Sequence, residues 1–549
     1  MRGGSSTSAP PTALLQAQIS TTETVRADVL GQLDSIDSKI QQKELELHAL
    51  ISQQQLLRDQ VANMDRALEI HRRSLTPILI LPADILAYLF HLVIDEYVAI
   101  SMEYLSLYRL GGHRAFAFNV AAVCRKWRHF ALAMPSIWAR IWLDLSKLTL
   151  YEPDPHLRVN RARVWNGYLS TCLTRSGTSP LYLFLTEVQH TASDDYDTTS
   201  YRAAMSQILG AAGRWRVCRM STSQSLCDEG SNFVSNLQLR TPLLEHFWLH
   251  YPVGIYDTVS PRPTPCRFLP FAPRLRYLCI PLTLACHTFS SMTEVKELEF
   301  CGGGPDNSAD WLGAFQLLER CPALERWTVG DVYNFNENGA SNMLDPPSSK
   351  YALRHLTTLH LQDIVYDVLA SWSDALSFPA LQQLTLDDYS NIPGVHSVLN
   401  GIAADSHVAT LIVRCEESFD DLDLSRLMAH FPELREIRLK AFTLYEGDFS
   451  QLLAKDSAGR RWRVCPDLRT FAMVDTYFYN EAVVTGFLDF VRARAASASD
   501  VPPGQDAPDS RFLESVDMGN IVGNETIPLW LPEAVRGILR GDTDLHIST

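Results

Sequence analysis

The sequence predicts an α/β fold in which a solenoid of parallel strands follows a long N-terminal helix and a small helical module. Three observations lead to this prediction: a leucine-containing phrase that recurs from about Pro180 onward, an apolar stripe at heptad spacing near the N-terminus, and short apolar helical patterns between them. The chain of 549 residues also exceeds the roughly 250–300 residues that a single hydrophobic core supports, so we expect several folding units.

Composition and charge narrow the classes of function. The net charge of −15 argues against a nucleic-acid partner, because general nucleic-acid binders carry a basic surface. The 11 cysteines include no CxxC pair and no His/Cys cluster with zinc-ligand spacing, and their odd number does not suit a disulfide framework. We therefore expect reduced thiols, no bound metal and a location in the cytoplasm or the nucleus.

Neither a signal peptide nor a membrane span is expected. Residues 1–11 lack the apolar core of a signal peptide. The most apolar stretch, 78–94, is short for a span and contains Pro82, Asp84 and His91. This stretch is better explained as a buried helix than as a contact with a membrane.

Residues 20–75 are predicted to form one coiled-coil helix behind a disordered head at 1–19. No Gly or Pro lies between Leu33 and Leu75, and with the heptad started at Leu33 nine of the twelve a and d positions are apolar. Alternating steps of three and four residues keep one narrow stripe facing a partner. The a and d positions are Leu33, Ile36, Ile40, Lys43, Leu47, Leu50, Gln54, Leu57, Val61, Met64, Leu68 and His71.

Two arrangements are open for this helix. In the first, the chain self-associates through paired helices, and Lys43 and Gln54 act as polar seam residues that fix register or oligomer state. In the second, a single amphipathic helix folds back on its own protein. The narrow stripe and the Gln-rich outer face favour pairing.

The segment 76–146 contains three informative runs. Pro77 ends the long helix, because proline lacks the backbone donor that a helix interior needs. The run 81–86 (LPADIL) then opens a helix with Pro near the first turn and an acid beside the positive end of the helix dipole. The run 120–131 (VAAVCRKWRHFA) is predicted to be one helix with Cys124 in its middle, where a buried structural thiol is expected, and 134–138 (MPSIW) follows.

Together these runs resemble the F-box family, whose pattern is an LPxE/D-type opening, a V-C-[RK]-x-W core helix and a final Pro-x-[IL]-W. The resemblance covers about one-eighth of the chain. It implies a three-helix module that docks on the Skp-type linker of a cullin–RING ubiquitin ligase. The linker-contacting and module-closing residues that it implies are Leu81, Pro82, Ile85, Leu86, Val123, Cys124, Trp127, Ile137 and Trp138. The segment between Asp95 and Asn119 is longer than the family pattern, and Gly111 and Gly112 predict a loop within it.

The local charge suits an acidic partner. Between Ser101 and Trp142 there are six Arg or Lys residues and one acid, Glu103, in contrast to the acidic chain as a whole. The alternative to docking is a small helical cap that packs only on the C-terminal domain.

The recurring phrase has the form Pro-x-Leu-x-x-Leu-x-Leu, with copies at 273–280, 322–329, 379–386, 432–439 and 466–473. Looser copies without the Pro extend the series, and the middle apolar residues are Leu278, Leu298, Trp327, Leu359, Leu384, Leu411 and Ile437. Their spacing of 20 to 32 residues predicts an irregular solenoid. Helices are expected between the strands, for example at 311–318 and 424–431, with a capping helix at 528–539.

These copies resemble leucine-rich repeats as found in F-box receptors. The resemblance divides the chain into a head (1–19), a coiled-coil helix (20–75), an F-box-like domain (76–146) and a leucine-rich-repeat-like substrate-recognition domain (147–549). A globular α/β domain with crossover helices is the alternative for the last part.

The expected function is therefore that of a non-catalytic adaptor that joins a ligase core to an unknown protein substrate. A ligase-independent interaction scaffold is the alternative. An enzyme is disfavoured, because the sequence contains no P-loop, GxSxG or HExxH motif. No catalytic residue and no cofactor is predicted.

Overall fold

The computed structural model divides the chain into two compact units, Met1–Phe90 and His91–Thr549. The boundary falls inside helix α3, Ala83–Glu103. The structure describes residues 11–74, 81–103, 115–145, 155–186, 198–221, 237–250, 267–285, 287–289, 292–301, 308–330, 351–362, 375–387, 392–414, 424–445, 447–455, 457, 462–495, 513–519 and 530–540.

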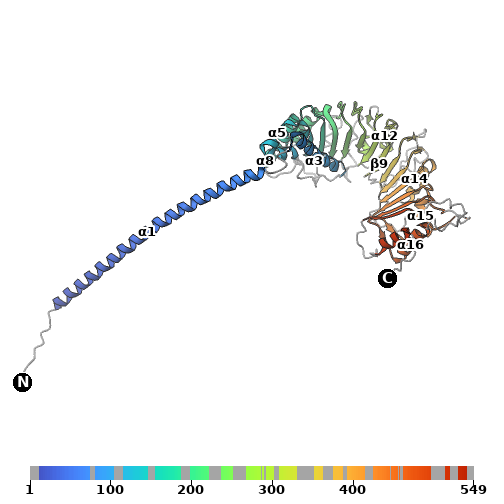
Figure 1. Cartoon of the computed structure of the whole chain (residues 1–549). Helices are drawn as coiled ribbons and strands as arrows, with labels where there is room; N and C mark the ends of the chain where they lie inside the picture. Colours follow the sequence, from blue (N-terminus) through green and yellow to red (C-terminus); the bar gives the residue numbers. More distant parts are fainter. Residues whose placement is uncertain are drawn as a thin grey trace, which may run out of the picture. The chain divides into compact units, whose positions relative to one another are not determined.

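Helix α1, Pro11–Ser74, makes up most of the first unit (Figure 1). It begins at Pro11 and not at Ser20, because Pro suits the first helical turn and residues 13–18 (ALLQAQ) are good helix formers. Residues 11–19, expected as part of a disordered head, are therefore helical. Residues 1–10 lie outside the described part of the chain. Every described side chain of α1 is exposed.

Three short helices precede the sheet: α4 Phe116–Val123, α5 Arg125–Ala133 and α6 Pro135–Trp138. The prediction of one helix across 120–131 is wrong, because Cys124 has an extended backbone (φ −158°, ψ 172°) that separates α4 from α5. Its Sγ accepts a hydrogen bond from the backbone N–H of Trp127 at 3.5 Å and so caps α5. Gly111 and Gly112 lie outside the described residues, and both ends of the 95–119 segment are helical.

The second unit is built on a 13-stranded sheet whose parallel strands follow one another in chain order (Figure 1). This order is what stacked repeats produce, and it agrees with the predicted solenoid-like α/β fold. The first strand lies inside the segment that was expected to form the F-box-like domain. The strands are β1 Arg140–Asp144, β2 Leu181–Thr186, β3 Trp215–Ser221, β4 His246–His250, β6 Tyr277–Ile280, β8 Glu297–Cys301, β9 Arg326–Gly330, β11 Thr358–Gln362, β13 Gln383–Asp387, β14 Thr410–Arg414, β15 Glu436–Lys440, β17 Thr470–Val474 and β19 Ser515–Gly519.

The middle apolar residues of the repeated phrase form one row across this sheet. Leu278 lies opposite Leu298, which lies opposite Trp327, and the row continues through the other predicted members. All seven are buried, so this row marks the core face of the sheet. The side chains that alternate with them lie on the opposite face.

The Pro-x-Leu part of the phrase forms the turn that enters each strand. Pro273 lies in the turn, and the N–H of Leu275 donates to the carbonyl oxygen of Ala272 at 3.2 Å. The equivalent bond joins Leu434 to Phe431 at 3.1 Å. Proline suits this turn because its φ is fixed near the required value and it needs no acceptor for a backbone N–H. Each phrase therefore encodes a turn, a buried anchor and a strand.

Helices cover the core face. Phe487 and Phe490 of α16 pack on Phe471 of the core row, with ring centroids 5.9 and 5.5 Å apart. The helices predicted at 311–318 and 424–431 correspond to α12 and α15, and α17 contacts β19 and α16 close to the predicted capping helix. The remaining helices are α8 Pro155–Arg175, α9 Thr198–Gly210, α12 Ser308–Glu319, α14 Ile392–Asp405, α15 Leu424–Ala429, α16 Glu481–Ala495 and α17 Leu531–Arg540, with 3-10 turns η2 Ala212–Arg214 and η3 Leu282–Leu284.

Three two-stranded parallel pairs accompany the large sheet. They are β5 Arg267–Phe268 with β7 Thr288–Phe289, β10 Tyr351–Ala352 with β12 Leu376–Ser377, and β16 Thr443–Leu444 with β18 Tyr477–Phe478.

Candidate protein-interaction site

The nine residues expected to contact or close around a linker fall into three groups by exposure. Exposed are Pro82, Ile85 and Val123, partly buried are Leu81, Cys124 and Trp127, and buried are Leu86, Ile137 and Trp138. The buried three are covered by the chain itself and pack in its core, and the role expected of Ile137 and Trp138 was to close the module. The other six residues of the set stay at least partly exposed.

Helix α3 carries apolar residues on two faces. Leu86, Phe90 and Ile94, spaced by four, are at most 5% exposed. Residues spaced by three and four also place an apolar stripe on a second helix face. That stripe consists of Ile85, Tyr88 and Leu92, which are 42%, 64% and 53% exposed. Tyr88 and Leu92 were not predicted as site residues, although successive steps of three and four residues from Ile85 indicate the same helix face.

The extended residue Cys124 determines how the VCRKW run is presented. It lets α5 turn back against α4, and the Nε of Arg128 donates to the carbonyl oxygen of Ala121 at 2.9 Å across the turn. Val123, the last residue of α4, is 60% exposed at this turn. The motif therefore builds a corner with an apolar tip rather than a continuous helix.

The final run, MPSIW, packs inward. The indole N–H of Trp138 donates to the carbonyl oxygen of Ala131 at 2.6 Å, and its ring meets the ring of Phe118 edge-on at 5.0 Å between centroids. Ile137 is 2% exposed. These contacts join α4, α5 and α6 into one small core directly before β1.

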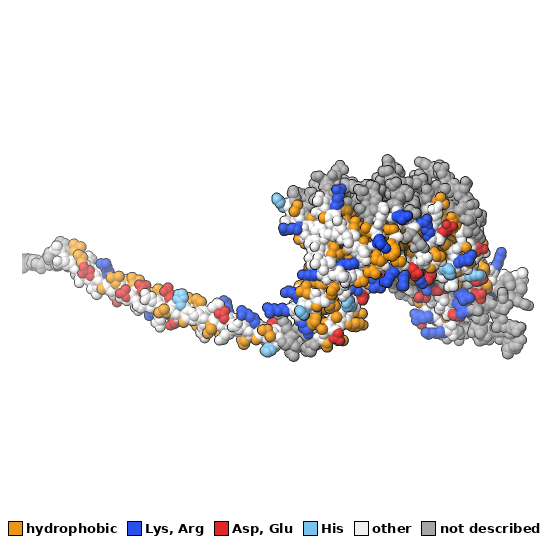
Figure 2. All heavy atoms as spheres, turned by 90° about the horizontal axis from the view of Figure 1, so that it is seen from above, with side chains coloured by type: hydrophobic (Ala, Val, Ile, Leu, Met, Phe, Trp, Pro, Cys, Tyr) orange, Lys and Arg blue, Asp and Glu red, His pale blue; other side chains and the backbone are white. Residues whose placement is uncertain are grey.

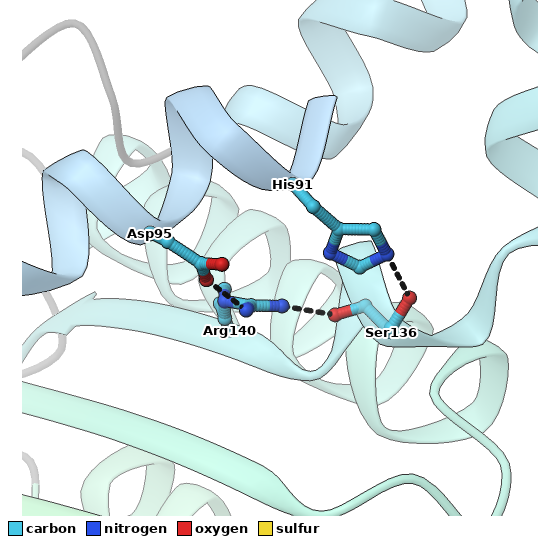
Figure 3. Close-up of polar contacts among 4 residues, drawn as sticks. All are labelled: His91, Asp95, Ser136 and Arg140. Carbon is cyan, nitrogen blue, oxygen red and sulfur yellow. Dashed lines mark hydrogen bonds and ion pairs between the residues drawn. The ribbon is translucent and has the colours of Figure 1, made fainter. Parts of the chain in front are cut away.

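Four polar residues fasten the second half of α3 to this core (Figure 3). His91 Nε2 and Ser136 Oγ share a hydrogen bond of 3.1 Å, and the Arg140 guanidinium bonds the Asp95 carboxylate and donates to the carbonyl oxygen of Ser136 at 3.1 Å. Burial, and then the charge of Arg140, lowers the pKa of His91. Sequence reasoning missed this cluster. The sequence signal for this cluster is the i, i+4 spacing of His91 and Asp95 on a largely apolar helix.

Among the described residues between Ser101 and Trp142, three of the predicted basic side chains lie exposed on α5. Arg125, Lys126 and Arg128 are exposed there. Arg140 contributes little to the surface potential, because its side chain is 9% exposed and paired with Asp95. Arg109 and Arg114 lie outside the described residues.

The face of the sheet opposite the core row differs in burial from one end to the other. Between β3 and β8 several side chains on this face are buried: they include Trp248, Cys279 and Cys301, and the Arg219 guanidinium lies 4.4 Å from the centre of the Trp248 ring. Between β11 and β15 the same face carries partly exposed charged and polar side chains. We call His360, Asp387, Arg414 and Arg438 the polar row.

Asp387 pairs with two other residues of the polar row. Its Oδ2 pairs with His360 Nε2 at 2.7 Å and with Arg414 Nη1 at 3.2 Å. Arg438 is 56% exposed and Arg414 44%, so both guanidinium groups face solvent in part. Partly solvated arginines on a rigid sheet are suitable donors for carboxylates or phosphates of a protein ligand.

Three buried thiols are poor candidates for a nucleophile. Burial raises the pKa of the Cys172, Cys321 and Cys465 thiols to about 12, so these groups stay protonated near neutral pH. No group of three or more His, Cys, Asp or Glu side chains in the described ranges is placed to hold a metal ion. Nor does any described helix combine the length and apolar character needed to cross a bilayer.

No protein-family model matches the sequence, and no curated protein is similar to it.

Proposed function

We propose that this chain is a non-catalytic substrate receptor of a cullin–RING ubiquitin ligase. The F-box-like runs dock on a Skp-type linker, and the leucine-rich-repeat-like sheet holds a protein substrate on its polar row. The observation that carries the proposal is that the motif runs leave apolar side chains in solvent, at Ile85 and Val123, beside residues of the same runs that form a core. Apolar side chains that stay exposed in a docking motif favour a protein partner.

The work of such a receptor is positioning. Holding a substrate beside a ubiquitin-transferring subunit turns an encounter in solution into an effectively intramolecular reaction. The receptor itself supplies no acid, base or nucleophile, and the reacting groups belong to other subunits. The exposed cations of α5 would speed association with an acidic linker surface and make it sensitive to salt.

Substitution of an exposed valine tests the docking step. Val123→Asp places a carboxylate at the apolar tip of the corner and should weaken capture of a Skp-type linker at least about tenfold, since an unpaired charge is costly to bury. Val164→Asp on α8 is the matched control, because Val123 and Val164 are 60% and 65% exposed and neither packs in the core. Equal capture by both variants would refute docking through this corner.

Trp127 is a poorer choice for this test. Its side chain is partly buried, so truncating it removes packing inside the corner as well as exposed surface. A Trp127 variant would therefore change the fold of the corner and its binding surface together.

A ligase-independent interaction scaffold is the second candidate. The observation that favours it is that α1 and the polar row lie in different units and each exposes side chains suited to a protein partner. The two functions differ in cells treated with an inhibitor of cullin activation. A receptor's substrates accumulate under that treatment, whereas the turnover of a scaffold's partners is unchanged.

A further inference from the structure

Helix α1 exposes a long apolar seam. The helix is 64 residues long, and the nine apolar a and d side chains between Leu33 and Leu68 are 49% to 63% exposed. A solvated helix of this kind gains little from propensity alone, because most helical stability in proteins comes from packing an apolar face. The seam also carries its own hollow. Figure 2 shows apolar side chains recurring along α1 among charged ones.

The hollow lies on the seam and is lined by Ile36, Lys39, Ile40, Lys43, Glu44 and Leu47. These are the d, g, a, d, e and a positions of the heptad that starts at Leu33. In a coiled coil each a or d side chain inserts into a hole formed by four residues of the facing helix. The six lining residues make two such holes that overlap, one ending at Lys43 and the other beginning at Ile40.

The heptad positions of the two holes determine which residues of a facing helix fill them. In a parallel pair with both helices in register, Ile40 of a second copy fills the hole formed by Ile36, Lys39, Ile40 and Lys43, where it packs on the two isoleucines and the lysine stems. Lys43 of the second copy fills the other, which contains Glu44. Lys39, at a g position, also faces Glu44 of the other helix in this arrangement. Each Glu44 carboxylate thus meets two ammonium groups from the partner helix, and the contacts occur twice in the dimer.

We infer that α1 is the dimerisation element of this protein and binds α1 of a second copy in a parallel, in-register coiled coil. The polar seam residue Lys43 is compatible with this pairing. In the free helix its ammonium group is already paired with Glu46 at 2.6 Å, so its charge is balanced before association. A dimer carries two copies of the F-box-like runs and two copies of the polar row. A substrate with two recognition segments would therefore bind with avidity.

Light scattering on the full-length chain tests the association itself. The expected mass is twice the 61.7 kDa of one chain. Glu44→Lys should raise the dissociation constant several-fold, and the triple variant Lys39→Glu/Lys43→Glu/Glu44→Lys should restore it, because the contacts of residue 44 with residues 39 and 43 of the other helix are again opposite in sign. A monomer mass at all concentrations would overturn the inference, and so would a Glu44→Lys dimer as tight as the wild type.

Cysteine cross-linking tests orientation and register. Leu33→Cys and Met64→Cys, made as separate variants, should each be joined into a covalent dimer by a short bis-maleimide. An antiparallel pair can bring at most one of these positions opposite itself, so failure of either variant would contradict the parallel arrangement. Asn63→Cys, one residue from Met64 and outside the seam, is the matched control and should cross-link no more than the wild type. None of these readouts depends on a ligase linker.

Discussion

The guanidinium carbon of Arg175 lies 4.4 Å from the centre of the Trp138 ring. Arg175 is the last residue of α8, which packs beside β1, and Trp138 is the last residue of α6. The contact joins the final F-box-like run to the first repeat of the sheet. With the hydrogen bond from Trp138 to Ala131, it places one indole at the junction of four helices. The corner at Cys124 is therefore held by the same core that precedes the large sheet.

Trp138→Ala should destabilise the second unit by about 3–5 kcal/mol, the usual loss when a fully buried Trp is truncated. Arg175→Met removes only the cation–π contact at an exposed position and should cost about 0.5–1 kcal/mol. Urea unfolding followed by tryptophan fluorescence measures both. Equal midpoints for the two variants would show that Trp138 does not anchor this core.

Arg494 provides a second internal anchor. Its side chain is 1% exposed, donates to the carbonyl oxygens of Cys465, Val464 and Leu452 at 2.6 to 2.9 Å, and lies 4.9 Å from the Trp462 ring centre. Arg494→Met leaves buried carbonyls without donors and should cost about 3 kcal/mol. Arg492→Met, on the same helix but solvent-exposed, should change the free energy of unfolding by less than about 0.5 kcal/mol. A similar cost at both positions would argue against the anchor.

Gly330 lies close to Gln362 of the neighbouring strand. A Cβ at this position would lie 2.5 Å from Oε1 of Gln362. That oxygen is the far end of a flexible side chain, so a change of the Gln362 rotamer should accommodate Gly330→Ala and the free energy of unfolding should change by less than about 1 kcal/mol. In a double-mutant cycle with Gln362→Ala the coupling should stay below about 0.5 kcal/mol. A larger coupling would mean that Gln362 is held in place and that the added methyl group is strained.

Stability should fall on acidification partly through His430. Burial, then the neighbouring His396 and Arg426, lower the pKa of His430 below its ordinary value near 6.5. The folded state then binds fewer protons than the unfolded chain, so stability is full above about pH 6.5 and declines as the pH falls through that value. His430→Gln should flatten this decline in unfolding midpoints measured from about pH 7.5 to pH 5.5. His407→Gln, at a ring that is 70% exposed, is the matched control, and an equal change of the pH profile in both variants would argue against His430 as the cause.

The strands were predictable because one phrase encodes turn, anchor and strand at short range. The middle apolar residues of the repeated phrase, from Leu278 to Ile437, lie in a single buried row, since a repeat that packs on its neighbour must keep one register. The early strands were harder to foresee. β1 and β2 lack the Pro-x-Leu phrase and lie before or at the start of the predicted repeats.

The helical part was less predictable for a physical reason. Cys124 breaks the 120–131 run although nothing in that run is a strong helix breaker, because its side chain caps α5 in place of a helical backbone bond. The exposed fraction of each apolar side chain could not be predicted from the sequence either. Ile85 and Leu86 are adjacent apolar residues in one motif, yet the first is 42% exposed and the second 0%. Only the packing of α3 separates a candidate contact residue from a core residue.

The most direct measurement is a titration of the purified full-length chain with a purified Skp-type linker, followed by calorimetry. The account predicts a saturable complex of one linker per chain, weakened at least about tenfold by Val123→Asp and unchanged by Val164→Asp. Absence of binding by the wild-type chain, or equal binding by both variants, would contradict the proposed receptor function.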